Sequence, residues 1–156
     1  NYFKIKINHN DNAQDISEKL SLLAAEKILD IVDDIFDNNI KFLEQDHSKA
    51  TYAKKINKIE GKINWNENAD KIIGKINGLY PFPGAFFLFN GERFKILKAE
   101  KSYTKGEPGM IIGEDLEICC KDGSIKVLVI QREGKRVQQI NEFLLGMQIK
   151  KGFNIA

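Results

Sequence analysis

The sequence contains few of the residues that mark metal centres, disulfide frameworks or membrane spans. Its 156 residues include 2 Cys, 2 His, 3 Pro and 1 Trp, and no apolar run approaches the ~20 residues of a membrane span. The cysteines, Cys119 and Cys120, are adjacent, which excludes an ordinary disulfide framework and leaves no C-x-x-C metal spacing. His9 and His47 are isolated and read as surface residues. We therefore expect no metal site and no membrane association.

A signal-peptide pattern is also lacking at the start of the chain, so we expect a cytoplasmic protein. The first residue is not Met, and strand-like sequence follows at once, which suggests a piece of a longer polypeptide. The composition that is present, 42% hydrophobic and 29% charged, is that of a globular domain. A chain of this length buries roughly two thirds of its unfolded surface.

Charge is divided unevenly along the chain. Residues 1–50 hold 6 Lys against 10 Asp and Glu, whereas residues 51–156 hold 18 Lys and Arg against 12 Asp and Glu. Two segments of opposite net charge suggest two structural units, and a basic C-terminal unit is compatible with a polyanionic partner. A solvated basic face without a partner gives the same count.

The first 40 residues are typical of one strand and one helix. Residues 2–7 alternate apolar and basic side chains, as a half-exposed edge strand does. Asp15 and Glu18 have capping-box spacing, and apolar residues at helical intervals follow as far as Ile35, which predicts a helix of about 20 residues. Residues 41–66 have no sustained period and are rich in Lys and Asn, so we place a linker there.

Residues 67–156 predict a short helix and then a small antiparallel sheet. Asn66 is placed to cap a helix with apolar residues at i, i+3, i+4 and i+7 from Ala69, ending at Gly78. Five short strands favour a small barrel of the oligonucleotide/oligosaccharide-binding (OB) kind, and a helical turn at 140–145 closes it. The strands are expected at 86–89, 93–99, 110–112, 116–120 and 125–131, with turns at Asn90-Gly91 and Asp122-Gly123.

Aromatic residues are interpreted as packing residues. Trp65 is expected to anchor the linker on the following domain, and alternation along the first strands sends aromatic side chains into the core. The phenylalanines concerned are Phe86, Phe87, Phe89 and Phe94.

Several of these segments, taken together, resemble the formyltransferases that use 10-formyltetrahydrofolate. KINW at 62–65 and YPFPGA at 80–85, with the apolar helix positions between them, resemble the hinge signature of this family. Four further segments resemble the members of this family that formylate initiator methionyl-tRNA. They are TYAKKI at 51–56, GMI at 109–111, QREGKR at 131–136 and FLLG at 143–146. The resemblance covers essentially the whole chain, and the order and spacing of the motifs make it specific.

The resemblance implies an α+β chain in three parts. Residues 1–40 are expected to be the final strand and helix of a Rossmann-like catalytic domain, 41–66 an interdomain linker and 67–156 an OB-like barrel domain. For the whole enzyme it implies 10-formyltetrahydrofolate as formyl donor and initiator methionyl-tRNA as acceptor, in translation initiation. We expect a monomer, in which the sheet edge at 2–7 is open to pairing with another copy.

In such an enzyme this part supports tRNA binding, which requires cations that face phosphates. Long basic side chains supply affinity and position with little geometric demand, and Gly134 is expected to form a turn that presents two of them. Each of these basic residues, taken singly, is explained equally well as an ordinary solvated surface residue. The candidates are Lys54, Lys55, Lys58, Lys62, Lys135, Arg136, Lys150 and Lys151.

Two other interpretations stay open at this point. A sugar-nucleotide formyltransferase shares the W and P-x-P-G-A elements but needs no basic surface that faces tRNA. A non-catalytic module that binds single-stranded nucleic acid favours exposed aromatic residues among basic ones.

We predict that the chain by itself transfers no formyl group. The family's chemistry needs an asparagine and a histidine to stabilise an oxyanion and an aspartate to assist proton transfer. Asn8-His9-Asn10 does not match that catalytic context, so no catalytic residue is assigned. Turnover of 10-formyltetrahydrofolate by the purified chain is the measurement, and a rate above the protein-free control would contradict the prediction.

Overall fold

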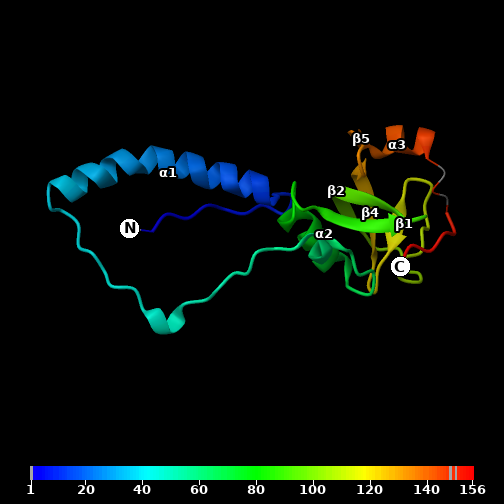
Figure 1. The fold of residues 1–156 in the computed structure, drawn as a ribbon, viewed down its shortest axis with the longest axis horizontal. Coiled ribbons are helices and arrows are strands. Elements are labelled where there is room, and N and C mark those ends of the chain that lie inside the picture. The colour runs from blue at the N-terminus through cyan, green and yellow to red at the C-terminus, as the bar shows by residue number, and fades with distance from the viewer. Residues whose placement is uncertain (1, 148, 150) are drawn as a thin grey trace. The chain divides into compact units, whose positions relative to one another are not determined.

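The computed structural model describes residues 2–147, 149 and 151–156. The chain divides into two units, one up to Ile56 and one from Asn57 onward. Figure 1 shows the long first helix and the sheet, which belong to different units.

The first unit contains α1, Ala13–Phe36, and a short 3₁₀ helix, η1, at His47–Lys49. Asn12, not Asp15, caps α1: its side chain accepts from the backbone N–H of Gln14 and Asp15. The Asp15 carboxylate in turn accepts from the Asn12 N–H, which completes a capping box. The helix was correctly predicted, but its start was placed too late because Asp15 occupies the third position of the box.

No residue of α1 is buried. Leu20, Leu22, Ile28 and Leu29 are exposed, and the apolar face predicted from the spacing has only partial cover from residues 39–43. An amphipathic helix of a globular protein ordinarily packs its apolar stripe against a core. The stripe of α1 lacks that core within the described part of this unit.

The edge strand predicted at residues 2–7 is wrong. These residues have no regular secondary structure, and no described segment pairs with them. An extended segment forms a stable strand only when neighbouring backbones share its hydrogen bonds and its apolar face is covered. The alternating side chains of residues 2–7 thus favour an extended strand, but this unit supplies no strand for them to pair with.

The second unit is built on five antiparallel strands. In the sheet their order is β1-β2-β4-β3, and β5 pairs with β4 outside this path. The hairpin turn predicted between the first two strands is confirmed, since Asn90 and Gly91 both have positive φ, at 51° and 77°. The strand bounds are β1 Ala85–Phe89, β2 Glu92–Ser102, β3 Glu117–Cys119, β4 Ser124–Arg132 and β5 Val137–Gln139.

The sheet is open, so the predicted OB-like barrel is not confirmed. On the outer side of β1, the described residues form no further strand, and Phe86 of β1 makes an isolated bridge with Lys62. The strand expected at 110–112 is reduced to two bridges, Ile111 with Ile118 and Met110 with Asn154. β5 was missed, because three residues are too short a run to show alternation.

Two helices cover the sheet. α2, Ala69–Gly78, buries Ala69, Ile72, Ile73 and Ile76, which is the face predicted from the spacing, and packs against β2 and β4. Its cap is Asn68, whose side chain accepts from the Lys71 N–H, and not Asn66 as predicted. α3, Ile140–Gly146, contacts β4 and β5, and Figure 1 shows it next to β5.

A run of four aromatic rings joins the linker, the hairpin and α3. Trp65 meets the Phe87 ring edge-on at 6.2 Å between centroids. Phe87 stacks on Phe94 at 5.5 Å, and Phe94 meets Phe143 edge-on at 5.8 Å. All four are buried, so Trp65 is the packing anchor that the sequence predicted.

The buried cysteines are structural. Cys119 and Cys120 are free thiols, and burial raises the pKa of the Cys120 thiol to about 12. Because the thiolate is the reactive form, a thiol with this pKa is inert near neutral pH.

We predict that Phe87→Ala lowers the free energy of unfolding by about 3–5 kcal/mol, because it removes a buried ring that contacts two others. Leu88→Ala is the matched control on the same strand. Leu88 is 44% exposed, and its truncation should cost less than about 1 kcal/mol. Urea unfolding of both variants measures the difference, and equal losses would contradict the packing described.

Candidate nucleic-acid interface

The part of the linker that belongs to the second unit lies along β1 and brings a lysine to the sheet. Residues Lys58–Gly61 form the 3₁₀ helix η2. Asn57 is its N-cap, and the Asn57 N–H donates to the Glu60 carboxylate at 2.7 Å. After η2 the Ile63 N–H donates to the Phe86 carbonyl at 2.8 Å. Gly61 leaves no room for a side chain, because a Cβ there would clash with the Gly84 carbonyl. The close approach of η2 to β1 fixes the backbone position of Lys58.

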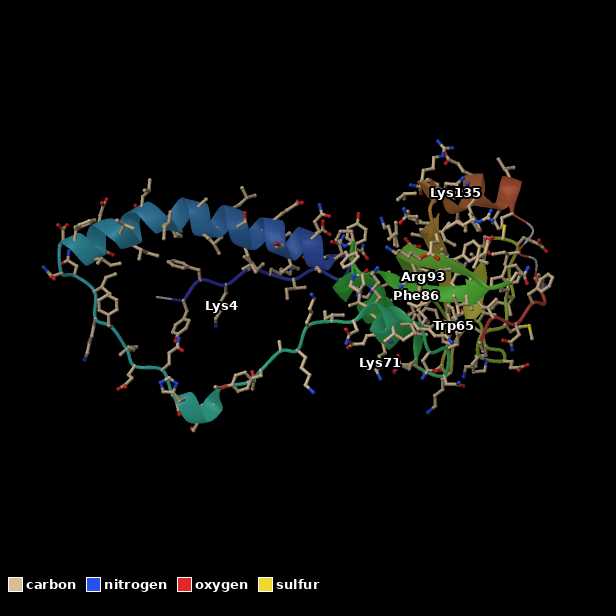
Figure 2. The ribbon with its side chains drawn as sticks, viewed as in Figure 1. Lys4, Trp65, Lys71, Phe86, Arg93 and Lys135 are labelled. Carbon is tan, nitrogen blue, oxygen red and sulfur yellow. The ribbon has the colours of Figure 1, made fainter. Side chains whose placement is uncertain are left out.

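Basic side chains of β2 face away from the core. Phe94 and Ile96 are buried, so the alternating residues Arg93 and Lys95 project to the other face. The Arg93 guanidinium carbon lies 3.7 Å from the centre of the Phe86 ring, and Arg93 Nη2 donates to the Lys58 carbonyl at 3.3 Å. Figure 2 shows Arg93 and Phe86 together on this part of the sheet. Arg93 therefore joins η2 to β2.

A cavity of about 240 Å³ opens where η2, β2 and the end of β4 meet, and we call it the hairpin cavity. Four cations and one carboxylate contribute to its wall, and one of the cations, Arg132, is paired with Glu92 at 2.6 Å. A concave site lined mainly by one sign of charge concentrates counter-ions of the opposite sign. The lining residues are Lys58, Phe82, Pro83, Arg93, Lys95, Gln131, Arg132, Glu133 and Gly134.

A second cavity, of about 260 Å³, lies beside it, and we call it the α3 cavity. Arg132 lines both cavities. Gly134 has φ +71°, and Gln131 Nε2 donates to the Lys135 carbonyl at 2.9 Å, so the predicted turn is present before Lys135. The α3 cavity is lined by Arg132, Lys135, Arg136, Gln138, Phe143, Gly146 and Met147.

The structure brings together three of the eight basic candidates. Lys58 lines the hairpin cavity, and Lys135 and Arg136 line the α3 cavity. Lys62 is exposed on the linker beside β1, where its carbonyl accepts from Lys75 Nζ at 3.1 Å.

The other four candidates lie elsewhere. Lys54 and Lys55 are exposed residues of the first unit. Lys151 is exposed in a turn beside Gly152, whose N–H donates to the Ile111 carbonyl, and it lines neither cavity. Lys150 lies outside the described residues.

Sequence reasoning missed Arg93, Lys95 and Arg132. The signal was present in residues 93–96, where basic and apolar residues alternate, so that buried Phe94 and Ile96 imply two outward cations. No sequence signal shows that Arg132 meets Glu92, 40 residues earlier, because that pair depends on how β2 and β4 are aligned.

The structure shows no metal-ligand cluster in the residues it describes. Within 2–147, 149 and 151–156 no three His, Cys, Asp or Glu residues gather as metal ligands would. His9 and His47 are exposed, and neither lines the cavities described above. Among the same residues, no helix combines the length and apolar character needed to cross a bilayer.

Comparison with known proteins identifies a family. The model of the formyl transferase C-terminal domain matches residues 55–148. The methionyl-tRNA formyltransferase of Pelagibacter ubique (strain HTCC1062) is 58% identical, with 100% of this chain and 51% of that protein aligned. The methionyl-tRNA formyltransferase of Thermodesulfovibrio yellowstonii is 38% identical, with 97% and 49% aligned. The chain thus spans about half the length of these curated relatives.

Solved structures support the fold. A crystal structure of HypX from Aquifex aeolicus matches with a TM-score of 0.68 at 16% identity, covering 97% of this chain and 31% of that one. A HypX structure in complex with tetrahydrofolic acid matches with a TM-score of 0.64 at 16% identity, covering 90% and 26%. At this identity the likeness concerns the fold alone.

We predict that Lys95→Gln weakens binding to duplex RNA and lowers the slope of log affinity against log salt by about 1, as expected when one phosphate contact is lost. Lys71→Gln is the control. Lys71 is exposed on α2 and paired with Glu67 at 2.6 Å, and its hydrogen bond holds the pKa of the Glu67 carboxyl below the usual value. Fluorescence anisotropy measures the affinity of both variants for the RNA at a series of salt concentrations. If Lys95→Gln and Lys71→Gln have the same slope, Lys95 does not belong to the contact surface.

Proposed function

The chain belongs to the formyltransferase family, whose C-terminal domain it contains, and we propose that it is the C-terminal part of an enzyme that formylates initiator methionyl-tRNA. In that reaction a formyl group passes from 10-formyltetrahydrofolate to the amino group of the methionyl ester, and this part holds the tRNA. Two relatives named methionyl-tRNA formyltransferase, at 58% and 38% identity, support the proposal. The cytoplasm is the corresponding location.

The observation that carries the tRNA-binding role is the pair of adjoining basic cavities. Between them they hold six cationic side chains on η2, β2, β4 and the turn after β4, and Arg132 contributes to both. Only Arg132 of these six is paired with a carboxylate within the part of the chain that the structure describes. A cluster of free cations suits a polyphosphate backbone, which is contacted through charge and position.

We propose Lys58, Arg93, Lys95, Arg132, Lys135 and Arg136 as the centre of this surface. Lys54, Lys55, Lys62, Lys150 and Lys151 stay in the proposal as further contacts along the RNA.

We propose residues 1–40 as the C-terminal remnant of the catalytic domain, 41–66 as the linker and 67–156 as the C-terminal domain. The exposed apolar stripe of α1 supports this division, because such a stripe is stable only against further apolar surface. The alternation of residues 2–7 supports it in the same way.

The residues of this chain do not fit a formyl-donor site. Formyl transfer needs polar side chains that converge on the reacting carbonyl, whereas His9 and His47 are exposed and line none of the cavities described. We assign no folate contact to any residue here.

The alternative of a single-stranded nucleic-acid module that stacks bases on the hairpin phenylalanines is disfavoured. Phe86, Phe87, Phe89 and Phe94 are all buried, so none of them presents a free ring face.

We predict that the chain binds initiator tRNA more tightly than an unrelated duplex RNA. If about five phosphates are neutralised, affinity should fall roughly 100- to 500-fold between 50 and 200 mM salt. The double variant Lys135→Gln/Arg136→Gln should reduce the salt slope by about 2.

The matched control is Lys71→Gln/Lys126→Gln, since these lysines are paired with Glu67 and Asp115 away from both cavities. Equal affinity for both RNAs would reduce the surface to non-specific electrostatics, and a flat salt profile would count against the basic set. No binding to either RNA would leave two interpretations: a sugar-nucleotide formyltransferase, or a tRNA enzyme whose affinity resides mainly outside this segment.

A further inference from the structure

Phe82 is an exposed aromatic ring in a region where the other phenylalanines are buried. Its side chain is 71% exposed, while Phe86, Phe87 and Phe94 are covered. It lines the hairpin cavity together with Pro83. A large apolar side chain held in water beside a concave charged site marks a place where a ligand supplies the missing cover.

The backbone holds Phe82 in place. It stands between Pro81 and Pro83, whose rings restrict φ, and Gly84 follows with φ +82°. The Gly84 N–H donates to the Leu79 carbonyl at 3.0 Å, which closes the turn after α2. A side chain on so restricted a turn loses little backbone freedom when it binds a ligand.

One cation lies near this ring, and two more line the same cavity. Lys95 Nζ lies 5.8 Å from the centre of the Phe82 ring, and Lys58 and Arg93 line the same cavity. Arg93 is fixed by its contact with Phe86 and its bond to the Lys58 carbonyl. The cavity thus offers an exposed aromatic ring and, beside it, positive charge already in position.

We propose that the hairpin cavity binds one unpaired nucleotide of the RNA, whose base stacks on Phe82 while its phosphate contacts Lys95, Lys58 and Arg93. A duplex would use only the cations, because its bases already stack on one another. An unpaired base has a free face, and stacking on aromatic side chains together with basic contacts is how proteins hold single strands. This inference rests on the proposed function for the identity of the RNA.

A second aromatic and cation pair provides the internal comparison. Tyr103 is 80% exposed, and Lys101 Nζ lies 5.6 Å from its ring centre. Lys101, however, is paired with Asp70 at 2.6 Å, and that hydrogen bond raises the pKa of its ammonium group. Tyr103 lines neither basic cavity, so it matches Phe82 in exposure and aromatic character but lacks the phosphate site.

The test uses the whole chain and a six-nucleotide unstructured RNA that carries one 2-aminopurine, whose fluorescence falls when it stacks. We expect quenching on binding. Phe82→Ala should remove it and weaken binding roughly 5- to 150-fold, the range found when a stacking aromatic is truncated. Phe82→Trp should preserve both signals, and Tyr103→Ala should change neither. A duplex with the same number of phosphates should bind Phe82→Ala and the unaltered chain equally well.

Phe82→Ala with unchanged quenching and affinity would overturn the inference. An equal loss of affinity for single strand and duplex would also overturn it, because the ring would then serve only the shape of the cavity.

Initiator tRNA separates this inference from the proposed function. Salt-dependent, preferential tRNA binding without any effect of Phe82→Ala on either RNA leaves the proposed function standing and refutes the stacking site. Phe82-dependent quenching without preference for the tRNA supports the stacking site and refutes the tRNA role.

Discussion

The packing of Phe87 on Phe94, between Trp65 and Phe143, is the contact on which the rest of the second unit depends. These rings come from the linker, the two hairpin strands and α3, so one run of aromatic contacts joins four segments. Since successive residues of a strand point to opposite faces, burying Phe94 and Ile96 forces Arg93 and Lys95 outward. The core therefore sets which cations reach the surface.

The linker owes its place to the same hairpin. Ile63 donates to the Phe86 carbonyl, and the Arg93 guanidinium covers the Phe86 ring. A cation over an aromatic ring contributes about 0.5–2 kcal/mol, depending on how far water is excluded. Arg93 thus has two roles: it holds η2 against the sheet, and it supplies positive charge to the hairpin cavity. Lys58 reaches that cavity only because η2 is docked.

Helices α1 and α2 show how much can be concluded from a periodic pattern of apolar residues. α1 and α2 both have apolar residues at helical spacing, and both form. α2 buries its stripe against β2 and β4, whereas α1 buries none of its residues. Periodicity determines that a helix is amphipathic, but not which surface covers it. The same holds for residues 2–7, whose alternation found no partner strand.

The sequence by itself determined the features that local chemistry controls. The Asn90-Gly91 turn, the buried face of α2, the packing role of Trp65 and the family motifs could all be predicted, because backbone preferences and hydrophobic period act over a few residues. Lys58, Lys135 and Arg136 could be named as candidates because they lie beside those motifs. Only the tertiary structure decided that Lys58, Arg93, Lys95 and Arg132 share one cavity with an exposed Phe82. That arrangement depends on strand register and on contacts such as Arg132 with Glu92, 40 residues apart, and no local pattern encodes separations of that length.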